Sequence, residues 1–491
     1  MDPTPAGRLR WFALAAILTT HCMDLLDGMM VNTAAPVIGK GLHGSSADLQ
    51  WMGAGYALAF ASLLITGGRL GDIAGRKRML LTGTAGFTCA SLLAGLAVNP
   101  EMIISARIVQ GCCAAVMVPQ GLGIMRELFP PRELPKAIGM MGPVVGIAAI
   151  VAPLLGGALT TGNLFGLGWR AVFFVNLPLG VLALFGAVRY IPGRPPAAGA
   201  SLRRLDGAGT ALTAGAMVLV AYPLMQGRTE GWPTWCFVSM AAALPVLVLL
   251  GVHQSRRARG RRAPLIEPSL VRNGGFVAAL VVGVLYYLAL SGMMFALQVQ
   301  LQTAHGFTAL GSGLAMVPWT AGSAVGSAVT GSLLVRRFGG RRTLRCGLAL
   351  LVVGAVGVIA VVSRSHAVSA WQLLVPLSLL GLGMGGVLTP YYNISLAMVT
   401  LPETGAASGL LNSVQQLGNG IGYALLGTVF FSCLTSGHRG ADDALRVTFW
   451  LAAGLLAAAF LIAFWMRPPT HRAAMPDNTA DRTDLVTDGQ V

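Results

Sequence analysis

Charged residues are scarce in this sequence. Asp, Glu, Lys and Arg make up only 11% of its 491 residues, whereas 55% are hydrophobic. A soluble domain is about one quarter charged, because a surface that faces water needs those side chains. The scarcity excludes an ordinary soluble globule and indicates that lipid is the solvent of this chain. The 65 glycines agree with this interpretation, since small residues let transmembrane helices approach closely.

Lysine is almost absent. The sequence contains only Lys40, Lys77 and Lys136, so arginine carries most of the positive charge. A net charge of +16 is compatible with nucleic-acid binding, but the basic residues stand in short connections between apolar runs, as expected of residues that set membrane topology. We therefore predict no nucleic-acid partner. The arginine bias is typical of a GC-rich genome, which points to a bacterial cell membrane.

The sequence also lacks the spacings that bind metals or build active sites. Its seven cysteines are scattered without a CxxC pair, which predicts neither a disulfide framework nor a zinc site. Residues 381–386 read GLGMGG and match GxGxxG, but they lie inside an apolar run and indicate helix packing. His438, Asp442 and Asp443 are too sparse for an enzyme site. We predict no metal, no cofactor and no enzymatic activity.

Long apolar runs, in contrast, are abundant. Each is long enough to cross a bilayer, which takes about 20 residues in a helix. The fourteen runs lie near 12–36, 50–70, 79–98, 103–125, 137–160, 170–190, 207–226, 233–253, 276–298, 310–334, 344–363, 371–393, 404–432 and 446–466. They predict an all-α polytopic membrane protein with fourteen transmembrane helices.

Basic residues fall unevenly on the two sides of these runs. If the runs cross the membrane alternately, one side carries 27 of the 34 Lys and Arg residues and the other side carries six, with Arg107 left inside a run. The positive-inside rule then places the richer side, which includes both chain ends, in the cytoplasm. Arg8 and Arg10 precede a first run without a convincing cleavage site, so we predict a retained helix and not a signal peptide.

A basic loop occurs twice in the sequence. Residues 68–78 read GRLGDIAGRKR after the second run, and residues 331–342 read GSLLVRRFGGRR after the tenth. The second copy is longer by one residue and lacks the Asp. Two such loops predict two related six-helix bundles, a transporter architecture. The expected divisions are a first bundle (1–200), two inserted helices (201–255), a basic connection (256–275), a second bundle (276–466) and a disordered polar tail (467–491).

The basic connection is the densest cluster of arginines. Residues 256–262 read RRARGRR. They suit binding of anionic lipid, or equally a solvated loop that only sets topology.

Five motifs in order resemble those of the major facilitator superfamily, specifically its fourteen-helix drug/proton antiporter branch. They are LDGMMVNTAAP at 26–36, GRLGDIAGRKRML at 68–80, RIVQG at 107–111, APLLGG at 152–157 and WRAVFFVNLPLG at 169–180. Met29 stands where the branch usually has Thr, and Ala148 and Ala152 stand where it usually has glycines. The resemblance covers residues 10–466.

The resemblance implies a secondary active transporter that exports small hydrophobic or amphipathic compounds in exchange for protons by alternating access. We expect the protein to act as a monomer. Its cofactor is then the proton gradient alone, and its partners are substrate, protons and lipid. An exporter of an endogenous metabolite, siderophore or lipid is the first alternative. A membrane sensor or scaffold is another, although such a protein need not keep charges at bilayer depth.

Three charged residues are expected inside the first bundle. Asp24 and Asp27 lie on one face of the first helix because they are three residues apart. The helical rise, counted from the cytoplasmic start of the first helix and from the outer start of the fourth, puts Asp27 and Arg107 at similar depths. The resemblance makes the first and fourth helices neighbours. We predict that Asp27, Asp24 and Arg107 form the proton-coupling cluster. The alternative is a static ion pair that fixes helix packing.

Two further motifs suggest conformational roles. In the loop at 68–78, Gly68 and Gly75 permit a tight turn, and the resemblance implies that Asp72 and Arg76 latch the cytoplasmic face against the opposite bundle. The alternative is a loop whose charges only set topology, which explains the arginines but not Asp72 and the glycines. In the fifth run, Pro153 is expected to kink the helix and Gly156 and Gly157 to permit close packing, and the resemblance implies that this helix seals the interface between the bundles. Generic helix packing is the alternative there.

Substrate contacts are expected in the second bundle, where no acidic residue lies deep in an apolar run. Aromatic, Met and amide side chains suit varied hydrophobic ligands, although each one alone also suits a helix–helix contact. The candidates are Tyr286, Tyr287, Met293, Phe295, Gln298, Trp319, Tyr391, Tyr392, Asn393, Asn412 and Gln415. The missing acids favour neutral, zwitterionic or singly cationic compounds.

Overall fold

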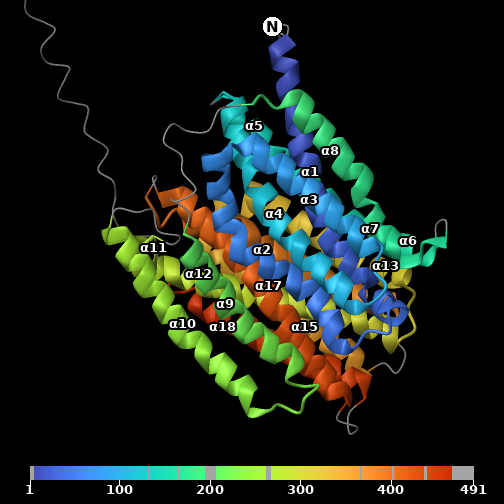
Figure 1. Cartoon of the computed structure of the whole chain (residues 1–491). Coiled ribbons are helices and arrows are strands. Elements are labelled where there is room, and N and C mark those ends of the chain that lie inside the picture. Colours follow the sequence, from blue (N-terminus) through green and yellow to red (C-terminus); the bar gives the residue numbers. More distant parts are fainter. Residues whose placement is uncertain are drawn as a thin grey trace, which may run out of the picture.

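The computed structural model describes residues 5–130, 132–163, 166–193, 206–260, 267–364, 368–400, 403–435 and 440–466. Within these ranges the chain is almost entirely helical and contains no strand. The tail predicted at 467–491 and part of the basic connection lie outside the described residues. Figure 1 shows long helices running side by side, with the N-terminal end of the first helix extending beyond the rest.

The helices follow one another in three groups. The first is α1 (Pro5–Gly41), α2 (Ser46–Ala74), α3 (Arg76–Gly95), α4 (Pro100–Leu128), α5 (Leu134–Gly139), α6 (Met141–Thr161), η2 (Gly168–Arg170), α7 (Ala171–Phe174) and α8 (Asn176–Tyr190). The second is α9 (Gly207–Gln226), α10 (Thr234–Arg259) and α11 (Pro268–Arg272). The third is α12 (Gly274–Thr303), α13 (Ala309–Val329), η4 (Thr330–Leu334), α14 (Val335–Phe338), α15 (Gly340–Arg364), α16 (Ala370–Leu396), α17 (Thr404–Thr435) and α18 (Ala441–Ile462).

Most apolar runs predicted from the sequence fall on one of these helices. Three runs are divided: 137–160 between α5 and α6, 170–190 among η2, α7 and α8, and 310–334 between α13 and η4. In the described chain, eleven helices are both long and apolar enough to cross a membrane. The prediction of a multi-pass, all-helical membrane protein is therefore confirmed. The runs that fall on α3, α6 and α13 stay predictions as crossings. Helices α3 and α13 are rich in Gly, Ser and Thr, and of α6 the described apolar stretch is Gly146–Thr161.

Polar side chains fix where several helices begin. Ser45 and Asp48 form a capping box at the start of α2, each side chain bonding the other residue's backbone amide. Asn99 accepts from the amide of Met102 at the start of α4 at 2.8 Å. Such caps satisfy backbone donors that the helix itself leaves free. They explain why the connections between long helices are so short.

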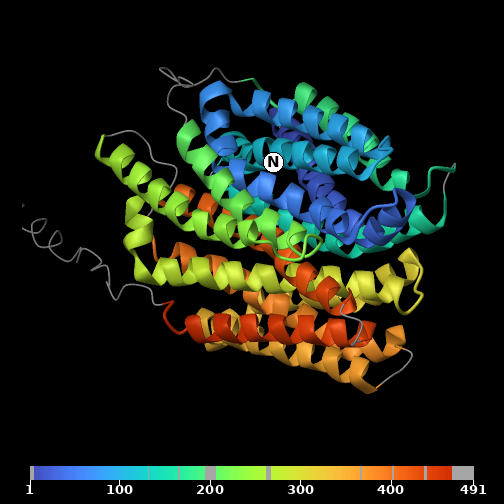
Figure 2. The same ribbon diagram turned by 60° about the horizontal axis from the view of Figure 1, so that its bottom comes forward.

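The same helix pairings occur in the first and third groups. In the first, α1 packs on α6 and α8, α4 packs on α2 and α3, and α3 packs on α8. In the third, α12 packs on α17 and α18, α16 packs on α13 and α15, and α15 packs on α18. Figure 2 shows the blue-to-cyan helices above the yellow-to-red ones. We call these two groups the first half and the second half.

Two helix pairs make the most extensive contacts between the halves. One is α2 with α17 and the other is α6 with α13. Helix α9 packs against both α2 and α17, and α10 packs on α9. The inserted pair therefore lies along one of the two seams and leaves the other to α6 and α13.

Hydrogen bonds attach α9 to both halves. The hydroxyls of Thr66 on α2 and Thr210 on α9 lie 2.7 Å apart. Near the other end of α9, Thr428 on α17 donates to the carbonyl of Leu224. Arg228, just beyond α9, donates to the hydroxyl of Ser46. The inserted helix is thus bonded across the α2–α17 seam at two levels.

A buried carboxylate fastens α10 to the start of α9. Asp206 caps α9 through the amide of Gly209 at 2.9 Å and accepts from Gln254 at 2.8 Å, and its Oδ1 lies 2.7 Å from Nε2 of His253. Burial alone raises the pKa of the Asp206 carboxyl, but these bonds and the nearby Arg257 charge outweigh burial and lower the pKa below its usual value.

The duplicated loop adopts similar turns in both halves. Gly75 separates α2 from α3 with φ +96°, and Gly339 separates α14 from α15 with φ +81°, backbone conformations that favour glycine. The second copy has one more residue between its glycines, and there the helix becomes the π-helical segment η4. A π-helical turn accommodates one additional residue, so η4 explains how the longer copy keeps the same turn.

Candidate proton-coupling site

Helices α1 and α4 bring the two predicted charges into direct contact. Asp27 on α1 is fully buried and Arg107 on α4 is 1% exposed. Nη1 of Arg107 donates to Oδ2 of Asp27. The two residues are 80 positions apart in sequence, so only the packing of α1 on α4 makes this pair. Their placement agrees with the depths expected from the sequence.

Uncharged side chains complete the surroundings of Asp27. Its Oδ1 accepts from Asn176 on α8 at 2.7 Å and from Gln110 on α4 at 3.3 Å. Both amides also donate to the hydroxyl of Ser91 on α3, at 3.2 Å and 2.7 Å respectively. Four helices of the first half therefore converge on one carboxylate.

Arg107 is held from three sides besides Asp27. Its Nε donates to the carbonyl of Met52 on α2 at 3.1 Å, and its Nη1 donates to Oε1 of Gln110 at 2.9 Å. The ring of Tyr56 on α2 covers the guanidinium, with Cζ 4.3 Å from the ring centroid. A cation over an aromatic face is stabilised by the ring quadrupole. These contacts satisfy a charge that is costly at bilayer depth.

Asp24 occupies a different environment one turn away. It is only partly buried by its neighbours, and it accepts from the hydroxyl of Tyr56. Tyr56 therefore touches both Asp24 and Arg107, the partner of Asp27. The three residues that the sequence assigned to one cluster are joined in the structure through this tyrosine.

The basic loop of the first half is bonded within that half. Asp72 accepts from Nη2 of Arg76 at 2.8 Å, and Arg76 Nε lies 3.2 Å from Oε1 of Glu127 at the end of α4. A Cβ on Gly68 would stand 3.7 Å from the Cβ of Pro119 on α4, an ordinary van der Waals distance. Among the described residues, Asp72 has no recorded bond to the second half, so the latch stays a prediction.

The fifth-run motif lies where α6 meets two helices at once. A Cβ on Gly156 would stand 2.9 Å from Cα of Met30 on α1, and one on Gly157 would stand 2.6 Å from the carbonyl oxygen of Ala309 on α13. The carbonyl of Pro153 faces Gly313 of α13 at a similarly short distance, 2.5 Å from its Cβ position. Only glycine fits such approaches, so this motif sets the seam between the halves.

Most of the substrate candidates lie in the interior of the second half. They are at most 5% exposed: Tyr286, Tyr287, Met293, Phe295, Gln298, Trp319 and Tyr391. Tyr286 donates to the carbonyl of Met384 at 3.1 Å, whereas the hydroxyls of Tyr287 and Tyr391 have no hydrogen-bond partner among the described residues. The buried set therefore combines packing with two unused hydroxyls.

The remaining candidates are more accessible. Tyr392 donates to Asn412 at 3.0 Å and to Gln415 at 2.9 Å. Asn393 and Asn412 are exposed, and Tyr392 and Gln415 are partly buried. Polar side chains on exposed faces of membrane helices are expected to meet water and not lipid. Tyr392, Asn412 and Gln415 therefore form the accessible part of the candidate substrate set.

Near the far end of α1, side chains bond the two halves together. Gln298 on α12 donates to the hydroxyl of Thr33 at 3.3 Å, and Gln302 donates to its carbonyl at 2.8 Å. Asn32 donates to the hydroxyl of Tyr423 on α17 at 2.7 Å. These bonds close the halves on the side predicted to face outward.

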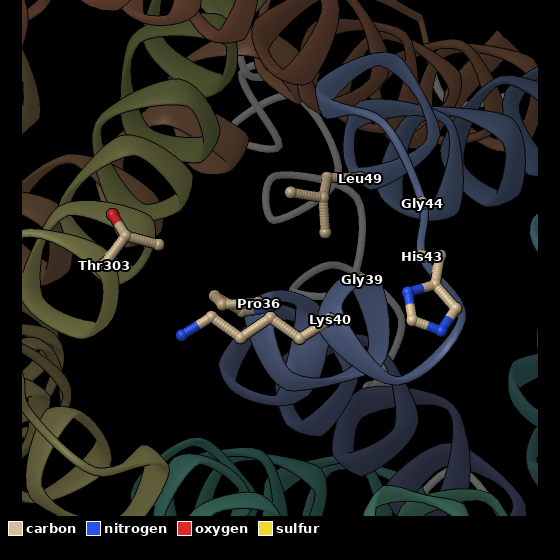
Figure 3. A pocket seen from close by; sticks show the side chains of 7 residues that line it. All are labelled: Pro36, Gly39, Lys40, His43, Gly44, Leu49 and Thr303. Atoms are coloured by element: carbon tan, nitrogen blue, oxygen red, sulfur yellow. The ribbon is translucent and has the colours of Figure 1, made fainter.

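A crevice of about 500 Å³ opens beyond these bonds, at the C-terminal end of α1. Figure 3 shows Pro36 and Lys40 of α1 on one side of it, with Thr303 of α12 and Leu49 of α2 across from them. Gly39, His43 and Gly44 complete its lining. The crevice lies at the predicted outer mouth between the halves.

Several members of the network are not apparent as site residues from sequence. Gln110 and Asn176 occur within quoted motifs, and their uncharged polar side chains in apolar runs are the only signal. Ser91 and Tyr56 carry no distinguishing pattern, because such residues are common in membrane helices. Their roles follow only from the way α2, α3 and α8 pack around α1 and α4.

Comparison with known proteins gives consistent matches over most of the chain. The model of the Major Facilitator Superfamily matches residues 17–423 and 279–487. The "Probable actinorhodin transporter" of Streptomyces coelicolor is 43% identical over 455 residues, which cover 92% of this chain and 78% of that protein. The "Tetracenomycin C resistance and export protein" of Streptomyces glaucescens is 34% identical, covering 87% and 78%. The "Puromycin resistance protein pur8" of Streptomyces alboniger is 35% identical, covering 86% and 82%.

Solved structures share the fold at low sequence identity. A proton dependent oligopeptide transporter superimposes with a TM-score of 0.66 at 15% identity, covering 93% of this chain and 99% of that one. A bacterial homolog of the human lysosomal transporter Spinster, in an inward-facing and occupied conformation, gives a TM-score of 0.64 at 16% identity, covering 93% and 96%. At these identities the similarity concerns the arrangement of helices.

Proposed function

Because the chain belongs to the Major Facilitator Superfamily, and to its drug-efflux branch, we propose that it exports small hydrophobic or amphipathic compounds in exchange for protons. Membership makes it a multi-pass transporter of a bacterial plasma membrane and not an enzyme. Relatives named for resistance to, or transport of, actinorhodin, tetracenomycin C and puromycin support antibiotic efflux as the setting.

The observation that carries proton exchange is the buried pair of Asp27 and Arg107. Keeping two charges inside a membrane bundle is costly, and a packing role alone does not need an ionisable pair. Burial favours the neutral carboxyl, whereas a nearby Arg favours the charged one. A change of conformation that separates the two residues therefore releases Asp27 to bind a proton, and one that joins them expels it. The driving force is the proton gradient, and no cofactor is required.

Alternating access is proposed as the way substrate crosses. The bonds from Thr33 to Gln298 and Gln302 close the predicted outer side, while Asp72 is paired within its own half. This combination supports an arrangement open to the cytoplasm. In the opposite state the outer bonds break and the loop at Gly68, Asp72, Gly75 and Arg76 latches the inner side.

The proposed architecture is two six-helix bundles with two inserted helices, fourteen crossings and both chain ends in the cytoplasm. The repeated helix pairing of the two halves supports the bundles, and the distribution of basic residues supports the orientation. The protein is proposed to act as a monomer. Export of an endogenous metabolite, siderophore or lipid is the second candidate, favoured by the relative named as an actinorhodin transporter.

A transport assay in inside-out membrane vesicles tests this function. Vesicles containing the chain, energised by a proton gradient, are expected to accumulate puromycin or tetracenomycin C from a panel of compounds. Asp27→Asn is expected to abolish proton-driven accumulation while the protein still inserts in the membrane. Asp48→Asn, at the exposed cap of α2, is the matched control and is expected to transport normally. Proton-driven accumulation that survives in Asp27→Asn contradicts the proposal.

A further inference from the structure

We infer that Tyr56 is a positioning residue that couples proton binding at Asp24 to the hold of Arg107 on Asp27. The inference rests on the proposed proton exchange and assigns separate tasks to the two carboxylates. Asp24 binds a proton from water first, and Asp27 stays the ionic partner of Arg107 until the arginine releases Asp27 to bind a proton in turn. Tyr56 joins the two by touching both ends of the network.

The contacts of Tyr56 make this link. Its hydroxyl donates to Oδ1 of Asp24, and its ring lies against the guanidinium of Arg107, 4.3 Å from Cζ to the centroid. The side chain is 7% exposed, so it has little room to turn without disturbing both neighbours. One rigid ring thus contacts an acid at its hydroxyl and a base at its face.

The two carboxylates differ in their donors and their exposure. Asp27 is fully buried and accepts from Arg107, Gln110 and Asn176. Three donors stabilise the charged carboxylate. The single side-chain bond recorded for Asp24 among the described residues comes from Tyr56, and Asp24 is only partly buried. Asp24 is therefore the less enclosed of the two carboxylates and has fewer donors to stabilise its charge.

The consequence of proton binding follows from hydrogen-bond chemistry. The charged Asp24 accepts from the phenol, which holds the ring over Arg107. When a proton from water binds a carboxylate oxygen of Asp24, the anion is lost and the phenol bond weakens. The ring is then no longer held at its hydroxyl, and the contact of the ring with the Arg107 guanidinium, one of those that fix Arg107 against Asp27, weakens with it. No covalent bond of Tyr56 forms or breaks, and the proton resides on Asp24.

Few other titratable groups face this network. On α1 they are His21 and Cys22 beside the two carboxylates, and on α17 Tyr423 stands near Arg107. Tyr423 accepts from Asn32. Helices α6, α12 and α13 also pack on α1. In the described chain, α6 and α13 carry no titratable side chain, and the titratable side chains of α12 are Tyr286 and Tyr287. A pH effect of a Tyr56 substitution is therefore assigned to Asp24 only if the effect disappears in the Asp24→Asn background, because His21, Cys22 and Asp27 titrate nearby.

The test compares Tyr56→Phe with Tyr222→Phe, a tyrosine on α9 whose ring packs on Trp51 and Trp235. Protons alone are the probe: the carboxyl band of Asp24 is titrated by infrared spectroscopy in reconstituted protein, with Asp24→Asn to identify the band. Tyr56→Phe keeps the ring and removes the donor to the anion. We expect its titration midpoint to rise by about one pH unit, a tenfold gain in proton affinity, and Tyr222→Phe to leave it unchanged.

The vesicle assay gives the second measurement. Tyr56→Phe is expected to move the pH profile of proton-driven efflux in the same direction, and Tyr56→Leu, which also removes the ring from Arg107, to lower the maximal rate further. Identical titration midpoints in Tyr56→Phe and the unmodified chain overturn the inference. Absence of proton-driven efflux in the unmodified chain overturns the proposed function instead, because the infrared titration does not require transport.

Discussion

The two halves of the molecule share their helix pairing but differ in chemistry. The first half places a buried ion pair among Gln110, Asn176 and Ser91. The second half places tyrosines and amides in its interior, and its described acidic residues, Glu403, Asp442 and Asp443, stand near helix ends. A repeated fold therefore carries two kinds of interior. The difference teaches that helix packing alone does not determine which half exchanges protons.

This contrast suggests a division of tasks. Ionisable groups in the first half suit proton exchange, because their charge depends on conformation and pH. Phenol and amide groups in the second half are neutral at physiological pH and suit recognition of varied compounds. Substitutions in the first half should then change coupling, and substitutions in the second half should change selectivity.

The largest effect is expected from separating the ion pair. Arg107→Ala leaves Asp27 buried without its charge partner, which typically costs about 3–5 kcal/mol. The double variant Asp27→Asn/Arg107→Leu removes both charges and is expected to recover most of that stability but no proton-driven transport. Chemical unfolding in detergent measures the first effect and vesicle assays the second. Equal stability of the single and double variants would show that the pair is not coupled.

The next effect concerns the seam that joins the halves. Gly157→Leu places a side chain where α13 already lies, so the halves cannot close and transport is expected to fall by more than about tenfold. Gly454→Leu is the control, because nothing stands within 4 Å of a Cβ at Gly454. Transport rates at matched membrane amounts decide the outcome. Similar rates in the two variants would mean that the α6–α13 contact does not need to be close.

A smaller effect is expected in the second half. Tyr392→Phe removes the hydroxyl that bonds Asn412 and Gln415, and each such bond contributes about 0.5–1.5 kcal/mol. The concentration of substrate for half-maximal transport should change about two- to tenfold, differently for different compounds. The pH profile should stay where it is. A displaced pH profile would contradict the division between the halves.

The smallest effect concerns the inserted pair, which belongs to neither half. The pKa of Asp206 is lower in the folded protein than in the unfolded chain, so its bonds stabilise the fold above the ordinary Asp pKa of about 3.9. That stability is lost as the pH falls through the lower folded pKa. Asp206→Asn should reduce the melting temperature by a few degrees at neutral pH and flatten its fall in acid. Melting curves between neutral and acidic pH measure this, and curves parallel to those of the unmodified chain would contradict it.

The sequence predicts the long helices well because each apolar run must span a fixed hydrocarbon thickness. It also predicts similar depths for Asp27 and Arg107, since helical rise fixes the depth of a residue once the start of its helix is known, and the family resemblance adds that their helices are neighbours. Tyr56 and Ser91 cannot be found this way, because their partners lie on other helices and depend on how those helices rotate. The neutral partners have no charge whose cost would reveal them.

Other features depend on tertiary structure in a different manner. The sequence shows one additional residue in the second basic loop but not the π-helical turn that contains it. It places Asp72 in a loop, but not its bond to Arg76. It also cannot separate the buried Tyr391 from the accessible Tyr392, because adjacent residues on a helix point about 100° apart and their surroundings decide.

The position of α9 makes the two flanks of the molecule unequal for anything dissolved in the bilayer. On one flank, α9 and α10 stand between the lipid and the line where α2 meets α17. On the other, Ile147 of α6 and Val325 of α13 are more than half exposed, so acyl chains reach that line directly. A membrane-soluble compound diffusing sideways toward the interior therefore finds one shielded approach and one open approach.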